Sequence, residues 1–278
     1  MCRNETIHAL VPALTIRDPS PLLPSVAIPT TAGTGAEVSL VAMVKDENEG
    51  KKLLFGSPFL ASDQALLDPT LLLTLPPRLT AATGMDAATH AIEAFVAEST
   101  NSSLTDILSL QSLRMLFTYL PQATKEGNNI EARSQTLVAS TMAGMSFSSS
   151  GVGIVHAIAH AIGGQYGTHH GTTNAVILPY GMEFNLSFAT PRYAQMARYL
   201  NLSHSKSDKS AASALIEAVK KLTSDLGLPE KLRDLPMPKL NSEKLNALVA
   251  LAMSDPAMIF NTRQATERDI IEILGRAY

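Results

Sequence analysis

The sequence predicts a small α/β portion followed by a larger all-helical portion. In the first quarter of the 278 residues, short apolar runs alternate with Gly, Asp and Pro, the pattern of strands joined by turns. After about Pro76, apolar residues recur at helical spacing over much longer segments. We therefore expect an α/β domain at residues 1–76 and an all-helical domain at residues 77–278.

The α/β portion contains short predicted strands bounded by turn-forming residues. Pro29 ends the first strand, and Asp68 with Pro69 ends the last. The strands are predicted at residues 26–28, 39–44, 52–55 and 65–67.

A loop rich in Thr and Gly, residues 28–37, follows the first predicted strand. Gly33 and Gly35 allow another molecule to approach the backbone closely, and the neighbouring Thr hydroxyls can donate hydrogen bonds to phosphate or ribose oxygens. The loop matches neither a Walker A motif nor a Gly-x-Gly-x-x-Gly fingerprint. An ordinary tight turn between a strand and a helix is therefore at least as good an explanation.

The helical portion carries clear start and stop signals. Pro77 suits the first turn of a helix, Gly227 with Pro229 ends another, and Thr266 with Asp269 resembles a capping box. The helices are predicted at residues 79–97, 104–120, 130–145, 152–162, 175–184, 193–200, 208–226, 242–253 and 266–278.

Histidines are clustered in the helical portion. Asp86 and His90 are four residues apart, as are His156 and His160, so each pair lies on one helix face. A glycine-rich turn at residues 163–167 can bring His170 back toward His156. Such a set of imidazoles and one carboxylate suits Fe²⁺ or Zn²⁺ better than Mg²⁺ or Ca²⁺. The same pattern also suits hydrogen-bonded histidines in a core.

The composition argues against several classes of protein. The chain has 22 basic and 25 acidic residues and no basic stripe, so we expect no nucleic-acid partner. No segment reaches the roughly 18 consecutive apolar residues of a membrane span. The single cysteine, Cys2, and the lack of an apolar leader at the start of the sequence predict a cytoplasmic protein. Only 17% of residues are charged, which favours extensive buried surface within or between subunits.

Four stretches, taken in order, resemble the iron-containing (group III) alcohol dehydrogenase family. They are IPTTAGTGAEVS at residues 28–39, LPPRLTAATGMDAATHAIEAF at 75–95, GVGIVHAIAHAIGGQYGTHHGTTNAVILP at 151–179 and NTRQATERDI at 261–270. The paired Asp-x-x-x-His and His-x-x-x-His segments, followed by a spaced His-Gly, are specific to that family and its relatives. The resemblance covers nearly the whole chain.

The resemblance implies a metal-dependent, NAD- or NADP-linked oxidation of small primary alcohols or diols, or reduction of the aldehydes. It also implies Fe²⁺, with Zn²⁺ as the alternative ion, and a homo-oligomer. The implied metal ligands are Asp86, His90, His156 and His170, with His160 as the proton relay beside them. The implied nucleotide contacts are Thr30, Thr31, Gly33, Thr34, Lys52, Thr74 and Leu75.

The resemblance implies the dehydroquinate synthase-like architecture, with a partial Rossmann-like nucleotide-binding domain in front of the metal-binding domain. The family's Gly-Gly-Gly-Ser pyrophosphate loop has no counterpart here, so we expect a chain that lacks the first part of its nucleotide-binding domain. Two alternatives stay open. One is a truncated, catalytically impaired protein that still binds metal, and the other is a non-redox metalloenzyme related to dehydroquinate synthase.

Overall fold

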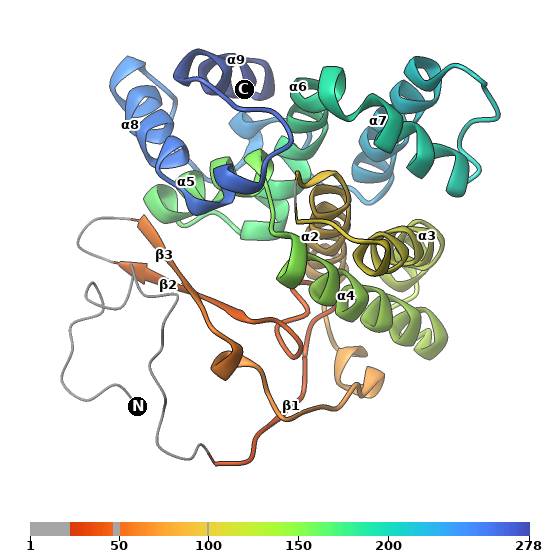
Figure 1. Cartoon of the computed structure of the whole chain (residues 1–278). Helices are drawn as coiled ribbons and strands as arrows, with labels where there is room; N and C mark the ends of the chain where they lie inside the picture. The colour runs from red at the N-terminus through yellow and green to blue at the C-terminus, as the bar shows by residue number, and fades with distance from the viewer. Residues whose placement is uncertain (1–22, 47–50, 99) are drawn as a thin grey trace.

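All strands that the structure describes precede the first long helix (Figure 1). The structure is a computed structural model, and it describes residues 23–46, 51–98 and 100–278. Cys2, which carried part of the expectation about compartment, lies outside these residues. The strands are β1 Val26–Ala27, β2 Val41–Asp46, β3 Lys51–Gly56 and β4 Gln64–Ala65, close to the predicted positions.

The strands form two separate two-stranded sheets within the described part of the chain. β1 and β4 are parallel, with Val26 opposite Gln64, whereas β2 and β3 form an antiparallel hairpin with Val41 opposite Gly56. The Thr- and Gly-rich loop leaves β1 and leads into β2 rather than into a helix. Two small sheets cannot bury much apolar surface by themselves, so this segment depends on the helices beneath it.

The rest of the described chain is helical and begins at Pro77, in agreement with the expected fold class. The helices are α2 Pro77–Val96, α3 Ser103–Lys125, α4 Ile130–Ser150, α5 Ile154–Tyr166, α6 His170–Tyr199, α7 Asp208–Asp225, α8 Ser242–Met253 and α9 Glu267–Ala277. Thr266 and Asp269 form the predicted capping box at the start of α9. Gly227, with φ of +67°, follows the end of α7 as predicted.

One helix prediction is wrong. The sequence predicts two helices at residues 175–184 and 193–200, but both belong to the single helix α6, which runs through Pro191. A proline removes one backbone hydrogen bond and normally interrupts a helix. Here Ala189, Tyr193 and Ala194 are buried on both sides of Pro191. Packing against the core therefore outweighs the local preference.

Helices α2 and α5 lie at the centre of the helical part, and most of their side chains are buried. Both are rich in Ala and Gly, which lets neighbouring helices approach closely. The Cβ that an alanine would add at Gly171 of α6, for example, would overlap the Ala82 carbonyl group of α2. Polar side chains on α2 and α5 therefore face one another inside an apolar core, where water cannot satisfy them.

Helices α4 and α5 are joined by a sharp bend of 102°. Gly151 lies in the bend with φ of +80°, a conformation that favours glycine. No single helix among the described residues has the length and apolarity needed to cross a membrane. The bent pair α4 and α5 reaches that threshold only when the two are counted together.

The segment before α2 is attached to the helices at a few close contacts. At Gly35, where φ is +66°, an added Cβ would lie 2.7 Å from Cα of Gly144 in α4. Ala32 and Leu72 are buried against Leu137 of the same helix. These contacts hold the Thr- and Gly-rich loop directly on α4.

Candidate metal centre

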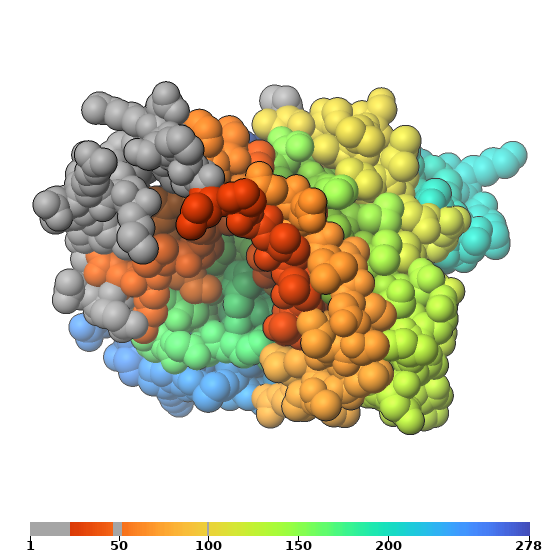
Figure 2. Space-filling model, turned by 90° about the horizontal axis from the view of Figure 1, so that it is seen from below, coloured from red at the N-terminus to blue at the C-terminus, as the bar shows by residue number. Residues whose placement is uncertain are grey.

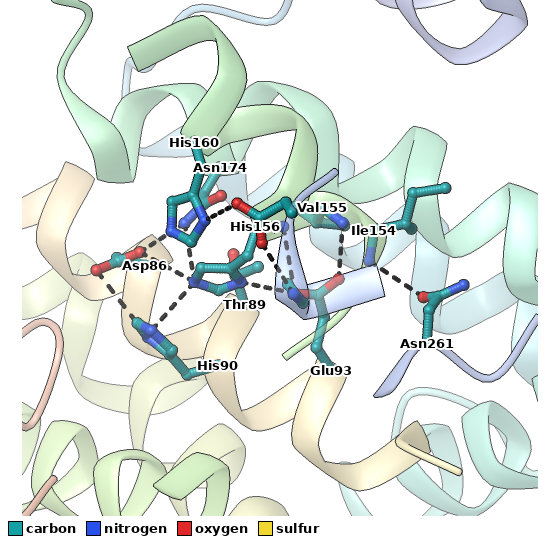
Figure 3. A network of polar contacts seen from close by, with 12 residues as sticks. Asp86, Thr89, His90, Glu93, Ile154, Val155, His156, His160, Asn174 and Asn261 are labelled. Carbon is teal, nitrogen blue, oxygen red and sulfur yellow. Dashed lines mark hydrogen bonds and ion pairs between the residues drawn. The ribbon is translucent and has the colours of Figure 1, made fainter. Parts of the chain in front are cut away.

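Three helices bring one carboxylate and two imidazoles together in the core. The ligand atoms of Asp86 on α2, His156 on α5 and His170 on α6 all lie within 4.8 Å of one another. Oδ1 of Asp86 is 3.8 Å from Nε2 of His156 and 3.5 Å from Nε2 of His170. Figure 3 shows Asp86 and His156 directed toward each other from their two helices. The spacing is that of atoms that can share one ion.

His90 lies beside these three residues, on the same face of α2 as Asp86. Its Nε2 is 3.1 Å from Nε2 of His156, and its Nδ1 is 4.0 Å from Oδ2 of Asp86. The His90 ring stacks on Phe147, with centroids 4.3 Å apart. The helical spacing thus places Asp86 and His90 side by side. His90 is not one of the three residues whose ligand atoms all lie within 4.8 Å of one another.

The turn that returns His170 to the cluster differs from the prediction. Gly163 and Gly164 lie inside α5 and do not form the turn. Gly167 alone takes the left-handed conformation, with φ of +67°, and ends the helix. His170 then begins α6, with His169 as its N-cap. One glycine, rather than a flexible run of three, is sufficient because it sits at the helix end where a positive φ is needed.

Burial sets the protonation of the cluster. It lowers the pKa of His90, and it lowers the pKa of His156 well below its ordinary value. It also lowers the pKa of His170, to about 3. Burial alone would raise the pKa of Asp86, but that pKa is lowered overall, and the hydrogen bond that Asn174 donates to the carboxylate is the cause that persists when the imidazoles are neutral. The site therefore holds neutral imidazoles around an ionised carboxylate.

Asn174 lies four residues after His170 on α6 and points into the cluster. Its Nδ2 donates to Oδ1 of Asp86 over 2.7 Å and lies 3.2 Å from Nε2 of both His156 and His170. The buried Nδ1 atoms of His90 and His170 have no hydrogen-bond partner among the described residues. The Asn174 amide has only two N–H bonds, so it cannot donate to Oδ1 of Asp86 and to the Nε2 atoms of both His156 and His170 at once.

This donor set fits a divalent cation. A buried carboxylate is costly unless a cation compensates it, and neutral imidazole is the form that binds metal. One oxygen with several nitrogen ligands suits Fe²⁺ or Zn²⁺. Asp86, His156 and His170 would hold the ion, with His90 adjacent.

His160 lies one turn beyond His156 on α5 and is held by a distant carboxylate. Its Nδ1 is 2.9 Å from Oδ2 of Asp255, which precedes the short helix η4 Pro256–Phe260. Its ring stacks on that of His170, with centroids 5.2 Å apart and an interplanar angle of 14°. The carboxylate favours the proton on Nδ1, so Nε2 is left with a free lone pair.

An apolar cavity of about 320 Å³ opens beside His160 and Asp255, between the β2–β3 hairpin and helices α4 and α5. Apolar side chains contribute most of the lining, among them Leu40, Val41, Leu54, Phe147 and Phe260. In the space-filling view from below, a hollow separates the red and orange segment before α2 from the green helices behind it (Figure 2). A small molecule with an apolar chain would fit this cavity.

Lys52 on β3 reaches the same region. It lines a second cavity, of about 210 Å³, together with His160 and Asp255. Burial lowers its pKa, while the charges of Asp86 and Asp255 oppose that shift. Its ammonium group therefore lies within the electrostatic field of the cluster.

The other predicted nucleotide contacts do not gather at Lys52. Thr30, Thr31 and Thr34 line a separate cavity of about 300 Å³ at the loop after β1. Gly33 is buried against Thr83 of α2, where an added Cβ would come within 3.1 Å. Thr74 is exposed, and neither Thr74 nor Leu75 belongs to the lining of the loop cavity.

Leu75 is instead fixed by a buried arginine. Its carbonyl oxygen accepts a hydrogen bond of 2.9 Å from Arg133 of α4. The same guanidinium donates to the Thr80 hydroxyl over 2.6 Å and to the Gly127 carbonyl over 2.9 Å. These contacts anchor the chain just before α2 begins.

Sequence profiles of known families match the two parts of the chain. A profile described as the C-terminal part of the Fe-containing alcohol dehydrogenase family matches residues 80–278, and one described as iron-containing alcohol dehydrogenase matches residues 1–69. The first match alone covers more than half of the sequence. The chain belongs to the iron-containing alcohol dehydrogenase family.

Individual members of the iron-containing alcohol dehydrogenase family are similar over nearly all of this chain. A 1,3-propanediol dehydrogenase of Citrobacter freundii is 36% identical over 93% of this chain and 66% of its own length. An NAD-dependent methanol dehydrogenase of Bacillus methanolicus is 36% identical over 92% of this chain and 67% of its own length. The solved structure of an alcohol dehydrogenase from Oenococcus oeni superposes with a TM-score of 0.92 at 34% identity, covering 99% of this chain and 71% of that one.

This member of the iron-containing alcohol dehydrogenase family spans about two thirds of the length of the curated relatives it matches. The profile matches and the superposition on the solved structure confirm the expected family and the expected fold class.

Three polar residues of the centre were not predicted from the sequence. Glu93 contacts His156, Asn174 contacts Asp86, and Asp255 contacts His160. Each partner lies at least 63 positions away in the chain, so no local pattern joins them. Glu93 alone left a signal, because it follows His90 by three residues on the face of α2 that carries Asp86.

Proposed function

We propose that this chain binds a divalent metal ion and takes part in the NAD(P)-linked oxidation of small primary alcohols or diols, or the reduction of the corresponding aldehydes. The observation that carries the proposal is the convergence of Asp86, His156 and His170 within 4.8 Å, next to His160 and an apolar cavity. The chain spans only about two thirds of its relatives' length, so their activity is carried over here as a hypothesis.

The proposed metal ligands are Asp86, His90, His156 and His170, with Fe²⁺ as the ion and Zn²⁺ as the alternative. Neutral imidazoles and an ionised Asp86 support this set, because no proton has to be removed from a ligand before metal binds. The fourth ligand, His90, is supported by its position 3.1 Å from His156.

When bound, the metal supplies Lewis acidity toward the alcohol oxygen, and the nicotinamide ring accepts hydride. His160 would take up the proton of the alcohol at Nε2, because Asp255 holds the proton of Nδ1 on the opposite side of the ring. Phe147 and the apolar lining of the cavity would exclude water from the reacting carbon.

The substrate class is supported by the size and lining of the cavity. About 320 Å³ is enough for a short alcohol, and the mostly apolar lining offers few polar partners. The names of two relatives, 1,3-propanediol dehydrogenase and methanol dehydrogenase, are consistent with short substrates.

We propose NAD or NADP as the second substrate, contacted by Thr30, Thr31, Gly33 and Thr34 at the loop, by Lys52 near His160, and by Thr74 and Leu75. One relative is named as NAD-dependent. The proposed division into an α/β nucleotide-binding domain at residues 1–76 and a metal-binding domain at 77–278 follows the positions of these groups. A homo-oligomer in the cytoplasm remains a prediction.

Three measurements on the purified chain test this function. Metal content after incubation with Fe²⁺ or Zn²⁺ tests the centre, NADH and NADPH fluorescence titrations test the nucleotide site, and reduction of NAD(P) with ethanol, 1-propanol or 1,3-propanediol tests the chemistry. We expect metal binding, nucleotide binding and turnover. Metal binding without nucleotide binding would instead favour the impaired, truncated protein. Metal and nucleotide binding without redox turnover would favour the non-redox metalloenzyme.

A further inference from the structure

Glu93 is a buried carboxylate that touches a candidate metal ligand from behind. It lies on α2 and is only 4% exposed. Its Oε2 is 2.6 Å from Nδ1 of His156 (Figure 3). The opposite ring nitrogen, Nε2, faces Asp86 and His170. Glu93 and the candidate metal position therefore lie on opposite sides of one imidazole ring.

This arrangement selects one tautomer of His156. Glu93 accepts hydrogen bonds from the backbone N–H groups of Val155 and His156, which favour its ionised form. An ionised carboxylate only accepts hydrogen bonds, so its short contact with Nδ1 then places a proton on that nitrogen. Neutral imidazole carries a single ring proton, and Nε2 is then left with a lone pair directed at the cluster. In the other tautomer, two lone pairs would meet across 2.6 Å and an N–H would point into the metal position.

The other two histidines of the candidate ligand set lack such support. The buried Nδ1 atoms of His90 and His170 have no hydrogen-bond partner among the residues that the structure describes. His156 is thus the candidate ligand whose ring orientation is fixed from the side away from the metal.

We infer that Glu93 is a positioning residue for metal binding, which fixes the Nδ1–H tautomer and the orientation of His156. The inference rests on the proposed function, because it assigns Glu93 a role toward the proposed metal. Carboxylates that orient metal-bound histidines in this way contribute substantially to affinity in other proteins.

A purely structural role for Glu93 would be to cap the start of α5, and it predicts the same effect on metal binding as the loss of any other cap there. The same carboxylate accepts hydrogen bonds from the backbone N–H of Val155 over 2.8 Å and of His156 over 3.4 Å, at the start of α5. Asn261 performs a similar task nearby, since its Oδ1 accepts from the backbone N–H of Ile154 over 3.2 Å. Asn261 is hydrogen-bonded to no histidine in the described part of the chain, so it provides a matched control for loss of the helix cap.

The experiment compares Glu93→Gln with Asn261→Ala in the full chain, using Co²⁺ as the probe. Titration gives the Co²⁺ dissociation constant, and the visible absorption of bound Co²⁺ reports the ligand geometry. We expect Glu93→Gln to weaken Co²⁺ binding by about 10- to 100-fold and to alter the absorption bands. Asn261→Ala should retain the wild-type spectrum and near wild-type affinity, although it lowers thermal stability.

Equal losses of Co²⁺ affinity in the two variants, or wild-type affinity in Glu93→Gln, would overturn the inference. Long-range ¹H–¹⁵N NMR of His156 in the metal-free wild-type chain gives a second test that needs no variant to fold. A dominant Nδ1–H tautomer supports the inference, and a dominant Nε2–H tautomer overturns it. If the wild-type chain binds no Co²⁺, Zn²⁺ or Fe²⁺, the proposed function fails, and the NMR measurement still decides the tautomer.

Discussion

The helices from α2 onward bury their apolar side chains against one another, whereas the segment before them buries few and relies on a helix to do so. The helices share one large apolar cluster that extends from Ala81 to Ala277. In the described part of the segment before α2, the buried cluster consists of Ala32 and Leu72, completed by Leu137 from α4. Several apolar side chains of that segment are exposed, among them Val26, Leu66 and Leu71. The candidate metal centre therefore lies among the helices that share the large apolar cluster, whereas the Thr- and Gly-rich loop takes its position from α4.

Removal of a candidate ligand should produce the largest effect, and this effect should be confined to the helices from α2 onward. We expect Asp86→Ala and His170→Ala to weaken metal binding by more than the roughly 100-fold that marks the upper range for outer-shell changes. Metal content per chain after gel filtration measures this. The exposed His204 provides the control, because His204→Ala removes an imidazole away from the centre. Stoichiometric metal in Asp86→Ala would contradict the ligand assignment.

Truncation of the small cluster should loosen the segment before α2 and leave the helices intact. Leu72 is fully buried, so Leu72→Ala should cost about 2–5 kcal/mol of local stability. Hydrogen exchange should then rise in β1 to β4 but stay slow in α2, α5 and α6. The matched change Leu116→Ala, in the large cluster, should accelerate exchange throughout the helices. Faster exchange in every helix of Leu72→Ala would show that the two parts unfold as one.

The contact between Gly35 and α4 offers a way to separate nucleotide binding from metal binding. In Gly35→Ala, the new Cβ would lie 2.7 Å from Cα of Gly144 and from the Ser140 carbonyl oxygen. We expect a cost of about 1–3 kcal/mol and a displaced loop, with weaker NADH binding and unchanged metal content.

Gly227→Ala isolates the backbone part of this cost. Gly227 has a similar φ of +67°, but an added Cβ meets nothing within 4 Å. It should lose about 1–2 kcal/mol and retain NADH affinity. Equal NADH affinity in the two variants would argue against a role of the Gly35 contact.

The smallest expected effect is on the pH dependence of stability, and it comes from a group of ion pairs at the surface of the helical part. Glu183 of α6 contacts Lys220 of α7 over 2.9 Å and Arg276 of α9. Burial raises the pKa of Glu183, but its hydrogen bonds and ion pairs with Lys220 and Arg276 hold that pKa below its usual value. The pairing therefore adds stability above the unfolded pKa, and this is lost as the pH falls through the lower folded pKa.

Glu183→Gln should remove less than about 1 kcal/mol at neutral pH, because the pair is partly exposed. Its loss of stability relative to wild type should disappear in acid. Glu217 also pairs with Lys220 but is 69% exposed, so Glu217→Gln should change little at either pH. Denaturant unfolding at several pH values measures both. A pH-independent deficit in Glu183→Gln would exclude the ionic origin.

Local patterns predicted the elements better than they predicted the site. The strands before Pro77, the capping box at Thr266 and the end of α7 at Gly227 depend on neighbouring residues, and the structure has them close to their predicted places. The continuity of α6 through Pro191 depends on tertiary burial, which no local preference contains.

The site shows the same division. Asp86 with His90, and His156 with His160, were recognisable because each pair repeats at helical spacing. The partners Asn174 and Asp255 become visible only in three dimensions, since their contacts join residues 88 and 95 positions apart. The grouping of Lys52 with the Thr residues of the loop is still a prediction, because these residues line different cavities.

The meeting of Gly35 and Gly144 has a consequence for how accurately the two halves of a reaction can be aligned. Most contacts between structural units pass through side chains, whose rotamers exchange rapidly and blur the distance between the units. Here main chain meets main chain, so the loop is referenced to α4 by atoms that have no rotamers. A shift of α4 by one residue would bring a side chain into this contact. The distance between the loop and the helices is therefore tied to the register of α4.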